Sequence, residues 1–268
     1  MTNRAVAISI SDSPDLAALG LGEQHLRDAM AEVARYLLVT GARLLYGGDL
    51  RASGFTELLF ELVERHRPNT GDEDMAKVVT NYLPWPVHMS LSADQLASRA
   101  ELLGPSASLV CLGRDGAVLP PKRRAKLAPK QPSSNDWSRG LTAMRRLMTG
   151  LSDARVLLGG RVEAYQGKMP GIAEEALLMI EARKPVFLLG GFGGCARDIA
   201  ETIGLAQPYQ TTRSIAWDGR RRFAGLSADE LRNGLTIAEN TTLACTVHID
   251  EAIVLLLRGV HRLFHSQQ

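Results

Sequence analysis

Three glycine-rich turns contain the residues of this sequence that are best suited to chemistry. Each turn follows a short apolar run and precedes a segment with helical spacing. Glycine lets the backbone approach a ligand closely, and the free amides of a helix N-terminus attract anions. The turns therefore predict a phosphate site, although paired glycines after a strand can also form a plain tight turn. The candidate ligand-binding residues are Gly47, Gly48, Asp49, Arg51, Gly54 and Thr56 in the first turn, Gly159, Gly160, Arg161, Lys168 and Gly171 in the second, and Gly190 and Gly191 in the third.

Charged residues flank the second of these turns. Two adjacent carboxylates, Glu174 and Glu175, fall in the first turn of the helix expected there, where they can recognise a ligand or simply stabilise the helix through its dipole. The preceding helix carries three arginines, Arg139, Arg145 and Arg146. A guanidinium group can pair with phosphate through two hydrogen bonds. We expect Arg145 or Lys168 to hold phosphate and Glu175 to hold a ribose hydroxyl.

Several familiar site types are missing from the sequence. None of the turns is a phosphate-binding loop ending in GKS or GKT, and none is a clean GxGxxG, so neither an ATPase nor a standard NAD site is indicated. The six histidines and three cysteines show no metal-ligand spacing. We therefore expect no metal and no cofactor.

The elements that position these residues follow from the hydrophobic pattern. Short apolar runs alternate with longer segments of helical period, which is typical of βαβ units around a buried parallel sheet. We expect an α/β fold, a Rossmann-like doubly wound parallel sheet with helices on both faces. The expected strands are residues 5–9, 43–46, 78–82, 109–112, 156–158 and 186–189. The expected helices are residues 23–40, 54–65, 93–103, 137–151, 172–182, 196–203, 228–233 and 249–264.

Two regions interrupt or end this pattern. We expect residues 1–205 to form the nucleotide-binding domain, with a mobile loop at 114–136 whose basic run KRRAK is either solvated or a lid over an anionic ligand. Residues 206–268 then form a C-terminal arm, with an irregular stretch or hairpin around Asp218-Gly219 and a final amphipathic helix. The apolar stripe of that helix packs on the same domain or on a second subunit, so we expect a homo-oligomer.

Composition excludes several classes of protein. The formal charge of +2 over 268 residues gives no concentrated basic character, which argues against a nucleic-acid partner. No apolar run approaches the roughly 20 residues needed to cross a bilayer, and no signal peptide is recognisable at the start. The widely spaced cysteines suit a reducing compartment. We expect a cytoplasmic protein without a membrane partner.

Two stretches resemble the SLOG superfamily of Rossmann-like nucleotide-binding proteins: LLYGGDLRASGFTELL, and MRRLMTGLSDARVLLGGRVEAYQGKMPGIAEEALL. The resemblance covers residues 1–205 in the order of elements and is sharpest over residues 144–178. The best-known members are the LOG enzymes, once called lysine-decarboxylase-like proteins, which cleave cytokinin nucleoside monophosphates to the base and ribose phosphate.

The resemblance implies roles for particular residues. LOG enzymes carry the signature PGGxGTxxE, whose glycines hold phosphate and whose glutamate engages the ribose and takes part in cleavage. Gly171 and Glu175 keep the spacing of the glycine and the glutamate, but residues 161–169 split the motif and Ile172 replaces its threonine. Arg145 with the next arginine is an approximate counterpart of the basic pair that precedes the motif.

With these departures, the sequence is more similar to the sensory SLOG domains of bacterial defence systems with TIR or sirtuin-like partners than to the LOG enzymes. The resemblance therefore implies a domain that binds a nucleotide-derived small molecule, such as an ADP-ribose-like or cyclic nucleotide signal, and passes the signal to a possible separate effector protein. The alternative is a LOG-like phosphoribohydrolase, in which Glu175 stabilises the cationic sugar as the N-glycosidic bond breaks. A third hypothesis is a scaffold with a vestigial pocket.

Overall fold

One six-stranded sheet organises the molecule. The computed structural model describes residues 3–48, 50, 54–65, 78–102, 107–208 and 216–265. The strands lie in the order β4-β3-β2-β1-β5-β6, and every neighbouring pair is parallel. Their bounds are Ala5–Ser11 (β1), Arg43–Tyr46 (β2), Val79–Leu83 (β3), Ala107–Cys111 (β4), Ala154–Gly159 (β5) and Val186–Leu189 (β6). The expected α/β class and all six expected strands are confirmed, with bounds that shift by a few residues.

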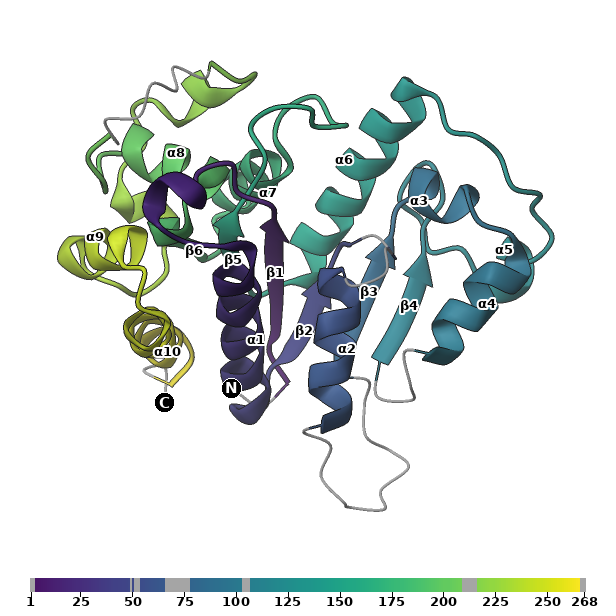
Figure 1. The fold of residues 1–268 in the computed structure, drawn as a ribbon, viewed down its shortest axis with the longest axis horizontal. Helices are drawn as coiled ribbons and strands as arrows, with labels where there is room; N and C mark the ends of the chain where they lie inside the picture. The colour runs from purple at the N-terminus through teal and green to yellow at the C-terminus, as the bar shows by residue number, and fades with distance from the viewer. Residues whose placement is uncertain are drawn as a thin grey trace.

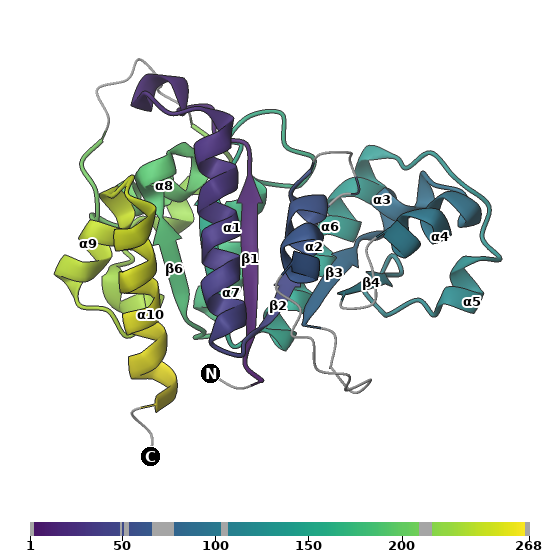
Figure 2. The ribbon, with the colours of Figure 1, turned by 60° about the horizontal axis from the view of Figure 1, so that its bottom comes forward.

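Helices cover both faces of this sheet (Figure 1). The helices α1, α2 and α10 lie on one face, while α6, α7 and α8 lie on the other, as a second view makes clear (Figure 2). The bounds are Glu23–Val39 (α1), Phe55–Arg65 (α2), Trp85–Met89 (α3), Ala93–Leu102 (α4), Pro121–Arg124 (α5), Ser134–Leu151 (α6), Gly171–Glu181 (α7), Gly194–Thr202 (α8), Ile237–Cys245 (α9) and Ile249–His265 (α10). This layered arrangement is the doubly wound fold that the sequence pattern predicts.

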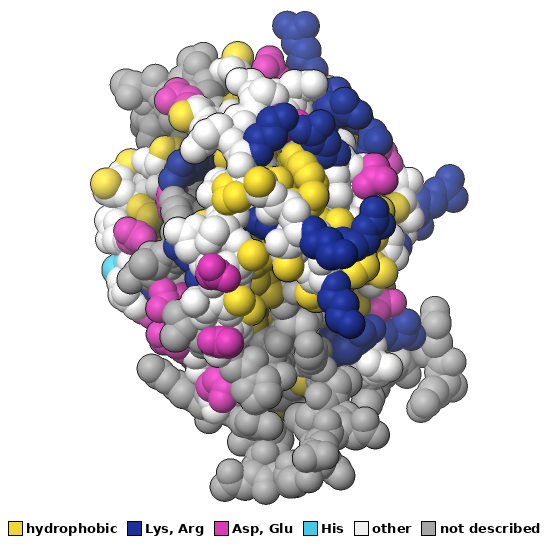
Figure 3. Space-filling model, turned by 90° about the vertical axis from the view of Figure 1, so that its right-hand side faces the viewer, with side chains coloured by type: hydrophobic (Ala, Val, Ile, Leu, Met, Phe, Trp, Pro, Cys, Tyr) yellow, Lys and Arg dark blue, Asp and Glu magenta, His cyan; other side chains and the backbone are white. Residues whose placement is uncertain are grey.

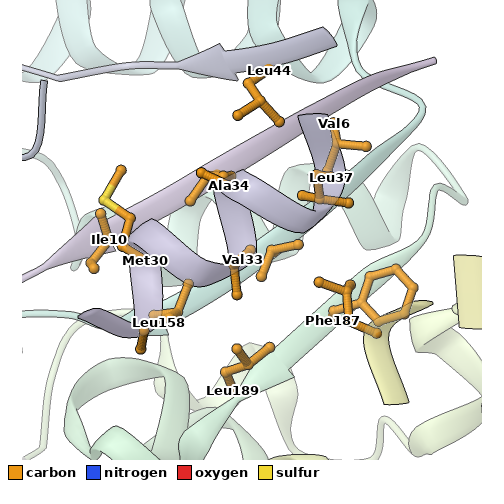
Figure 4. Packing of buried hydrophobic residues seen from close by; sticks show 14 of the residues in the cluster. Val6, Ile10, Met30, Val33, Ala34, Leu37, Leu44, Leu158, Phe187 and Leu189 are labelled. Carbon is orange, nitrogen blue, oxygen red and sulfur yellow. The ribbon is translucent and has the colours of Figure 1, made fainter. Parts of the chain in front are cut away.

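The core forms where the apolar face of α1 packs on the sheet (Figure 4). Met30, Val33 and Leu37 recur at helical spacing on α1 and are fully buried. They meet alternate residues of β1, among them Val6 and Ile10. Burial of a side chain of this size stabilises the fold by about 1.5–3 kcal/mol. Because β1 is buried on both faces, its first four residues are all apolar, as is typical of a central parallel strand.

The strand order reverses beside β1. From β1 the chain moves outward through β2, β3 and β4, and it then returns to place β5 and β6 on the opposite side. The carboxyl ends of β1 and β5 therefore lead into helices on opposite sides, which leaves a crevice between them. Ligands bind at such switch points in open α/β sheets.

Three helices that the sequence analysis does not predict complete the fold. Both α3 and α5 begin in proline-containing stretches, which the hydrophobic pattern treats as loops. Proline is tolerated in the first turn of a helix because that turn has no partner for its amide. The third, α9, spans nine residues and packs against β6.

The segment 114–136 is more structured than the mobile loop expected there. It contains α5 and the start of α6, and the Arg124 side chain is buried beneath it. Arg124 Nε donates to His88 Nδ1 at 2.8 Å, and Nη2 donates to the carbonyl oxygens of His88 and Leu91. His88 Nε2 donates in turn to the carbonyl of Leu112, and burial lowers the pKa of this imidazole to about 4. One arginine of the basic run therefore anchors the segment, whereas Lys122 and Arg123 are exposed.

The C-terminal residues pack on the same domain. The apolar stripe of α10, including Ile253, Leu256 and Val260, joins the core that α1 shares with the sheet. No strand occurs around Gly219 in the described residues; instead a 3₁₀ turn spans Arg220–Phe223, so the hairpin interpretation is wrong there. In the part of the chain that the structure describes, no helix is long and apolar enough to span a membrane.

Candidate functional site

A cavity of about 340 Å³ opens at the strand-order reversal. The carboxyl end of β1 lines it with Ser9 and Ser11, and the end of β2 adds Gly47 and Gly48. Helix α6 and the N-terminus of α7 supply the opposite wall. The cavity thus occupies the position that the topology predicts, and its volume lies at the lower end of the range for small-molecule sites.

The N-terminus of α7 faces this cavity through Gly171 and Ile172. A Cβ atom at Gly171 would lie 2.6 Å from Nη2 of Arg145, so only glycine lets the guanidinium group pass this close to the helix end. The amides of a helix N-terminus carry a partial positive charge. These amides and the guanidinium group of Arg145 are hydrogen-bond donors suited to a phosphate or carboxylate.

A buried group of charges stands behind that surface. Arg145 Nη1 forms a hydrogen-bonded ion pair with Glu174 Oε2, while Thr142 Oγ1 donates to Glu174 Oε1 at 2.5 Å. Glu175 Oε1 lies 3.3 Å from Nη1 of Arg155 and 3.7 Å from Nε of Arg145. Each carboxylate therefore has a guanidinium neighbour, and of the two only Glu175 lines the cavity.

Arg155 is fully buried in the middle of β5. Its Nη1 donates to Ser9 Oγ at 2.8 Å, which ties the charged group to the floor of the cavity. Burial lowers the pKa of Arg155, and the carboxylate of Glu175 acts in the opposite direction. Nε and Nη2 of Arg155 and Nε of Arg145 have no protein hydrogen-bond partner among the described residues. Unsatisfied donors of this kind are costly and mark sites where polar ligands or solvent bind.

The remaining walls are aromatic or belong to the loop before α7. Tyr46, Phe55 and Trp137 line the cavity, and such rings can stack on a base. The loop 161–169 contributes Tyr165, whose hydroxyl donates to Asp218 at 3.1 Å. At the rim, Arg161 forms an exposed ion pair with Asp12. The cavity therefore combines an anionic-group site with an apolar wall.

The structure brings six of the predicted site residues to the cavity wall: Gly47, Gly48, Arg145, Arg161, Gly171 and Glu175. Asp49 and Arg51 lie outside the described residues. Five others are not part of the lining: Gly54, Thr56, Gly159, Gly160 and Glu174. Thr56 and Gly160 serve packing, because a Cβ at Gly48 would lie 2.7 Å from Thr56 Oγ1 and one at Gly160 would lie 2.6 Å from Ile172. Lys168 lines a separate groove on the far side of α6.

The third glycine turn is not brought to the cavity. A Cβ at Gly190 would lie 2.5 Å from the carbonyl oxygen of Ala244, and one at Gly191 would collide with that of Thr246. These glycines therefore allow the end of α9 to pack on the turn. The N-terminus of α8 is also occupied from within the chain, since the Asp15 carboxylate accepts from the Gly194 amide at 2.6 Å.

Arg155, Ser9 and Trp137 are the chief site residues that sequence reasoning misses. An arginine inside the apolar run ARVLLG was a usable signal, because a charge is almost never buried in a sheet without a partner. Ser9 carries no such signal, since a hydroxyl within a strand is common. Among the described residues, no group of three or more His, Cys, Asp and Glu side chains is placed to hold a metal ion.

Comparison with protein families gives a match over most of the chain. The family described as SLOG cluster2 matches residues 1–239. The chain belongs to this SLOG family. The match includes every residue that lines the cavity. SLOG membership supports a nucleotide-related function for this protein.

Among solved structures, this chain is similar to one from a structural genomics project. The X-ray structure of TM1055, a structural genomics target, has 18% sequence identity and a TM-score of 0.41, over 75% of this chain and 82% of that chain. No curated protein matches this chain.

Proposed function

We propose that this SLOG protein binds a nucleotide-derived small molecule, of the ADP-ribose or cyclic nucleotide kind, and acts as a sensor for it. The observation that carries the proposal is the cavity at the strand-order reversal, where the N-terminus of α7 and Arg145 meet aromatic side chains. A phosphate suits the positive end of that cavity, and a base suits its aromatic wall.

The surroundings of Glu175 favour binding over cleavage. A carboxylate that stabilises a developing cationic sugar acts most strongly when its charge is not already neutralised. Glu175 Oε1 instead lies 3.3 Å from one guanidinium group and 3.7 Å from another, those of Arg155 and Arg145. Such a paired carboxylate can still accept a hydrogen bond from a ribose hydroxyl. It is better placed to hold a ribose than to assist departure of the base.

Ile172 supports the same conclusion. Its side chain packs near Gly160 and lines the cavity at the start of α7, where the resembling LOG signature has threonine. An isoleucine offers no hydroxyl to a phosphate or to an attacking water. The donors available to a phosphate at this end of the cavity are therefore the helix amides and the guanidinium group of Arg145.

A LOG-like phosphoribohydrolase is the second candidate function. The observation that favours it is the position of Glu175, which lines the cavity one turn into α7 and keeps the glycine-to-glutamate spacing of the enzyme signature. A nucleoside monophosphate would then be cleaved to base and ribose phosphate.

The deciding experiment measures binding and turnover on the same protein. AMP, ADP-ribose and cyclic ADP-ribose are each added to the purified chain, the melting temperature is recorded, and the nucleotides are then analysed by mass spectrometry. A specific ligand at 100 times its dissociation constant adds about 2.7 kcal/mol to the free energy of unfolding. We expect at least one nucleotide to raise the melting temperature and to be recovered intact.

Two substitutions make this result specific. Arg161→Gln changes an exposed cation at the rim of the cavity and should weaken binding without unfolding the protein. Glu181→Gln is the matched control, because Glu181 lies at the other end of α7 in an exposed ion pair with Arg222. Release of free base that stops in Glu175→Gln, at a temperature where circular dichroism shows that variant to be folded, but persists in Glu181→Gln would replace the sensor with the hydrolase. No stabilisation by any nucleotide would contradict both.

A further inference from the structure

A second concave surface lies on the other side of α6 from the nucleotide cavity. It is a groove of about 700 Å³ between α6, the turn at residues 113–117 and Lys168. Along α6, Arg139, Ala143 and Arg146 recur at helical spacing and line this groove. The residues of α6 that line the nucleotide cavity are a separate set, Trp137, Leu141 and Arg145.

The groove has an uncompensated positive charge. Arg139, Arg146 and Lys168 have no carboxylate partner in the described part of the chain, and all three side chains are exposed. The fourth cation, Arg114, lies 3.3 Å from Asp136. Asp115 is the one acidic residue of the lining, and its Oδ1 accepts a hydrogen bond from the amide of Ala117. The groove therefore favours an anionic ligand.

The lining also selects among anionic ligands. Small-molecule sites are mostly apolar and enclose their ligand, whereas here the cations lie at exposed positions around an open groove. Binding of single-stranded nucleic acid relies on aromatic side chains on which bases stack, and this lining contains none. Exposed guanidinium groups around an open groove suit a protein interface, where arginine is enriched.

We propose that this basic groove, formed by Arg114, Arg139, Arg146 and Lys168, docks an acidic segment of a partner protein. Glutamate and aspartate side chains of that segment pair with the three cations that have no internal partner. The guanidinium groups of Arg139 and Arg146 can each bind a carboxylate through two parallel hydrogen bonds. The test of this docking site is made without nucleotide, so its outcome does not depend on the proposed nucleotide function.

Fluorescence anisotropy of a labelled peptide tests the docking site on the full chain. The probe is a short peptide of glutamate and glycine, and the same peptide with glutamine in place of glutamate is the neutral control. We expect the acidic peptide to bind, the neutral one not to bind, and the affinity to fall as salt is added. In Arg139→Gln/Arg146→Gln we expect the dissociation constant to rise about tenfold, the sum of two exposed ion pairs.

A matched double variant distinguishes loss of the groove's own cations from a general loss of positive charge. Lys122→Gln/Arg123→Gln removes the same charge from α5, on a surface where basic side chains also gather (Figure 3). We expect this variant to bind the acidic peptide like the unchanged protein, and Lys168→Gln to weaken it. Equal losses in the two double variants, or no binding of the acidic peptide, would overturn the proposal. So would tighter binding of a single-stranded oligonucleotide that Arg139→Gln/Arg146→Gln abolishes. Unchanged melting temperatures show that these exposed substitutions leave the fold intact.

Discussion

At the scale of single residues, the charge pairs beneath the cavity constrain what each carboxylate can do. Arg155 is buried in β5, and Glu175 is its carboxylate neighbour among the described residues, at 3.3 Å. Because ions in a protein interior are strongly desolvated, the pair is a modest source of stability when intact but costly to break. Buried Arg155 needs the counter-charge of Glu175, so this pair holds Glu175 in place whichever function the cavity has.

Glu175→Gln should destabilise the protein by about 3–5 kcal/mol, because it leaves the Arg155 guanidinium buried without a counter-charge. Urea unfolding followed by circular dichroism measures this change. Glu181→Gln on the same helix should shift the free energy of unfolding by no more than about 0.5 kcal/mol, since both members of its ion pair are exposed. Equal effects of the two substitutions would show that Arg155 does not need Glu175.

His88 gives the protein a predictable acid sensitivity. In the folded protein the pKa of this imidazole is about 4, below its ordinary value of 6.5, because burial disfavours the charged form. Between pH 6.5 and pH 4, the unfolded chain therefore holds a proton on this imidazole that the folded chain lacks. The stabilising contribution is complete above pH 6.5 and is lost as the pH falls toward 4, by about 2–3 kcal/mol at pH 4.5.

In His88→Asn the free energy of unfolding should be lower at pH 7 but should depend less on pH between 6.5 and 4.5 than in the unchanged protein. Unfolding curves at several pH values measure both slopes. If the two slopes agree, His88 does not remain neutral as the pH falls.

At the scale of elements, two similar glycine turns have different uses. The turn before α7 borders the cavity, whereas the turn after β6 makes room for the end of α9. Three glycine turns at one edge of a sheet therefore do not amount to three ligand-binding loops. Packing of the C-terminal helices decides which turn remains open.

Gly191→Ala should destabilise the protein, because its Cβ would collide with the backbone carbonyl of Thr246, which no rotamer change can relieve. Gly150→Ala in α6 is the matched control: a Cβ there has no atom within 4 Å, so alanine should stabilise the helix by about 0.5–1 kcal/mol. Melting temperatures of the two variants should move in opposite directions. A neutral Gly191→Ala would mean that α9 does not pack tightly on this turn.

At the scale of the whole molecule, α6 and the loop before α7 connect the two concave surfaces. Residues 161–169 contribute Tyr165 to the cavity at the strand-order reversal and Lys168 to the basic groove. Thr142 lines the groove and donates to Glu174, which pairs with Arg145 of the cavity. A ligand that moves Arg145 therefore acts on groups that also shape the groove.

We expect nucleotide and acidic peptide to change each other's affinity by the same factor, as linkage requires. Thr142→Val removes the hydroxyl that joins Glu174 to the groove and should reduce this factor. Calorimetric titration of each ligand, with and without the other, measures it. Independent affinities in the unchanged protein would show that the cavity and the groove are not coupled.

The sequence by itself determined the sheet and the edge at which its glycine turns lie. The largely apolar β1 must lose water on both faces, which favours a central strand of a parallel sheet. The amphipathic period of α1 predicts a helix that covers one face of that sheet. The sequence also predicted the positions of Gly171 and Glu175 at the start of a helix, because a glycine before a helix and a carboxylate in its first turn are local features.

Only the tertiary structure decided which residues share the site. Arg155 and Glu175 are 20 positions apart in sequence and meet because β5 and α7 pack together, and Ser9 reaches the same pair from β1. Gly191 has the composition of a ligand-binding turn but lies against α9, whose path no local pattern specifies. Contacts between distant segments depend on the sum of packing over the whole chain, so local sequence rules predict the elements and their edge but not the partners of each side chain.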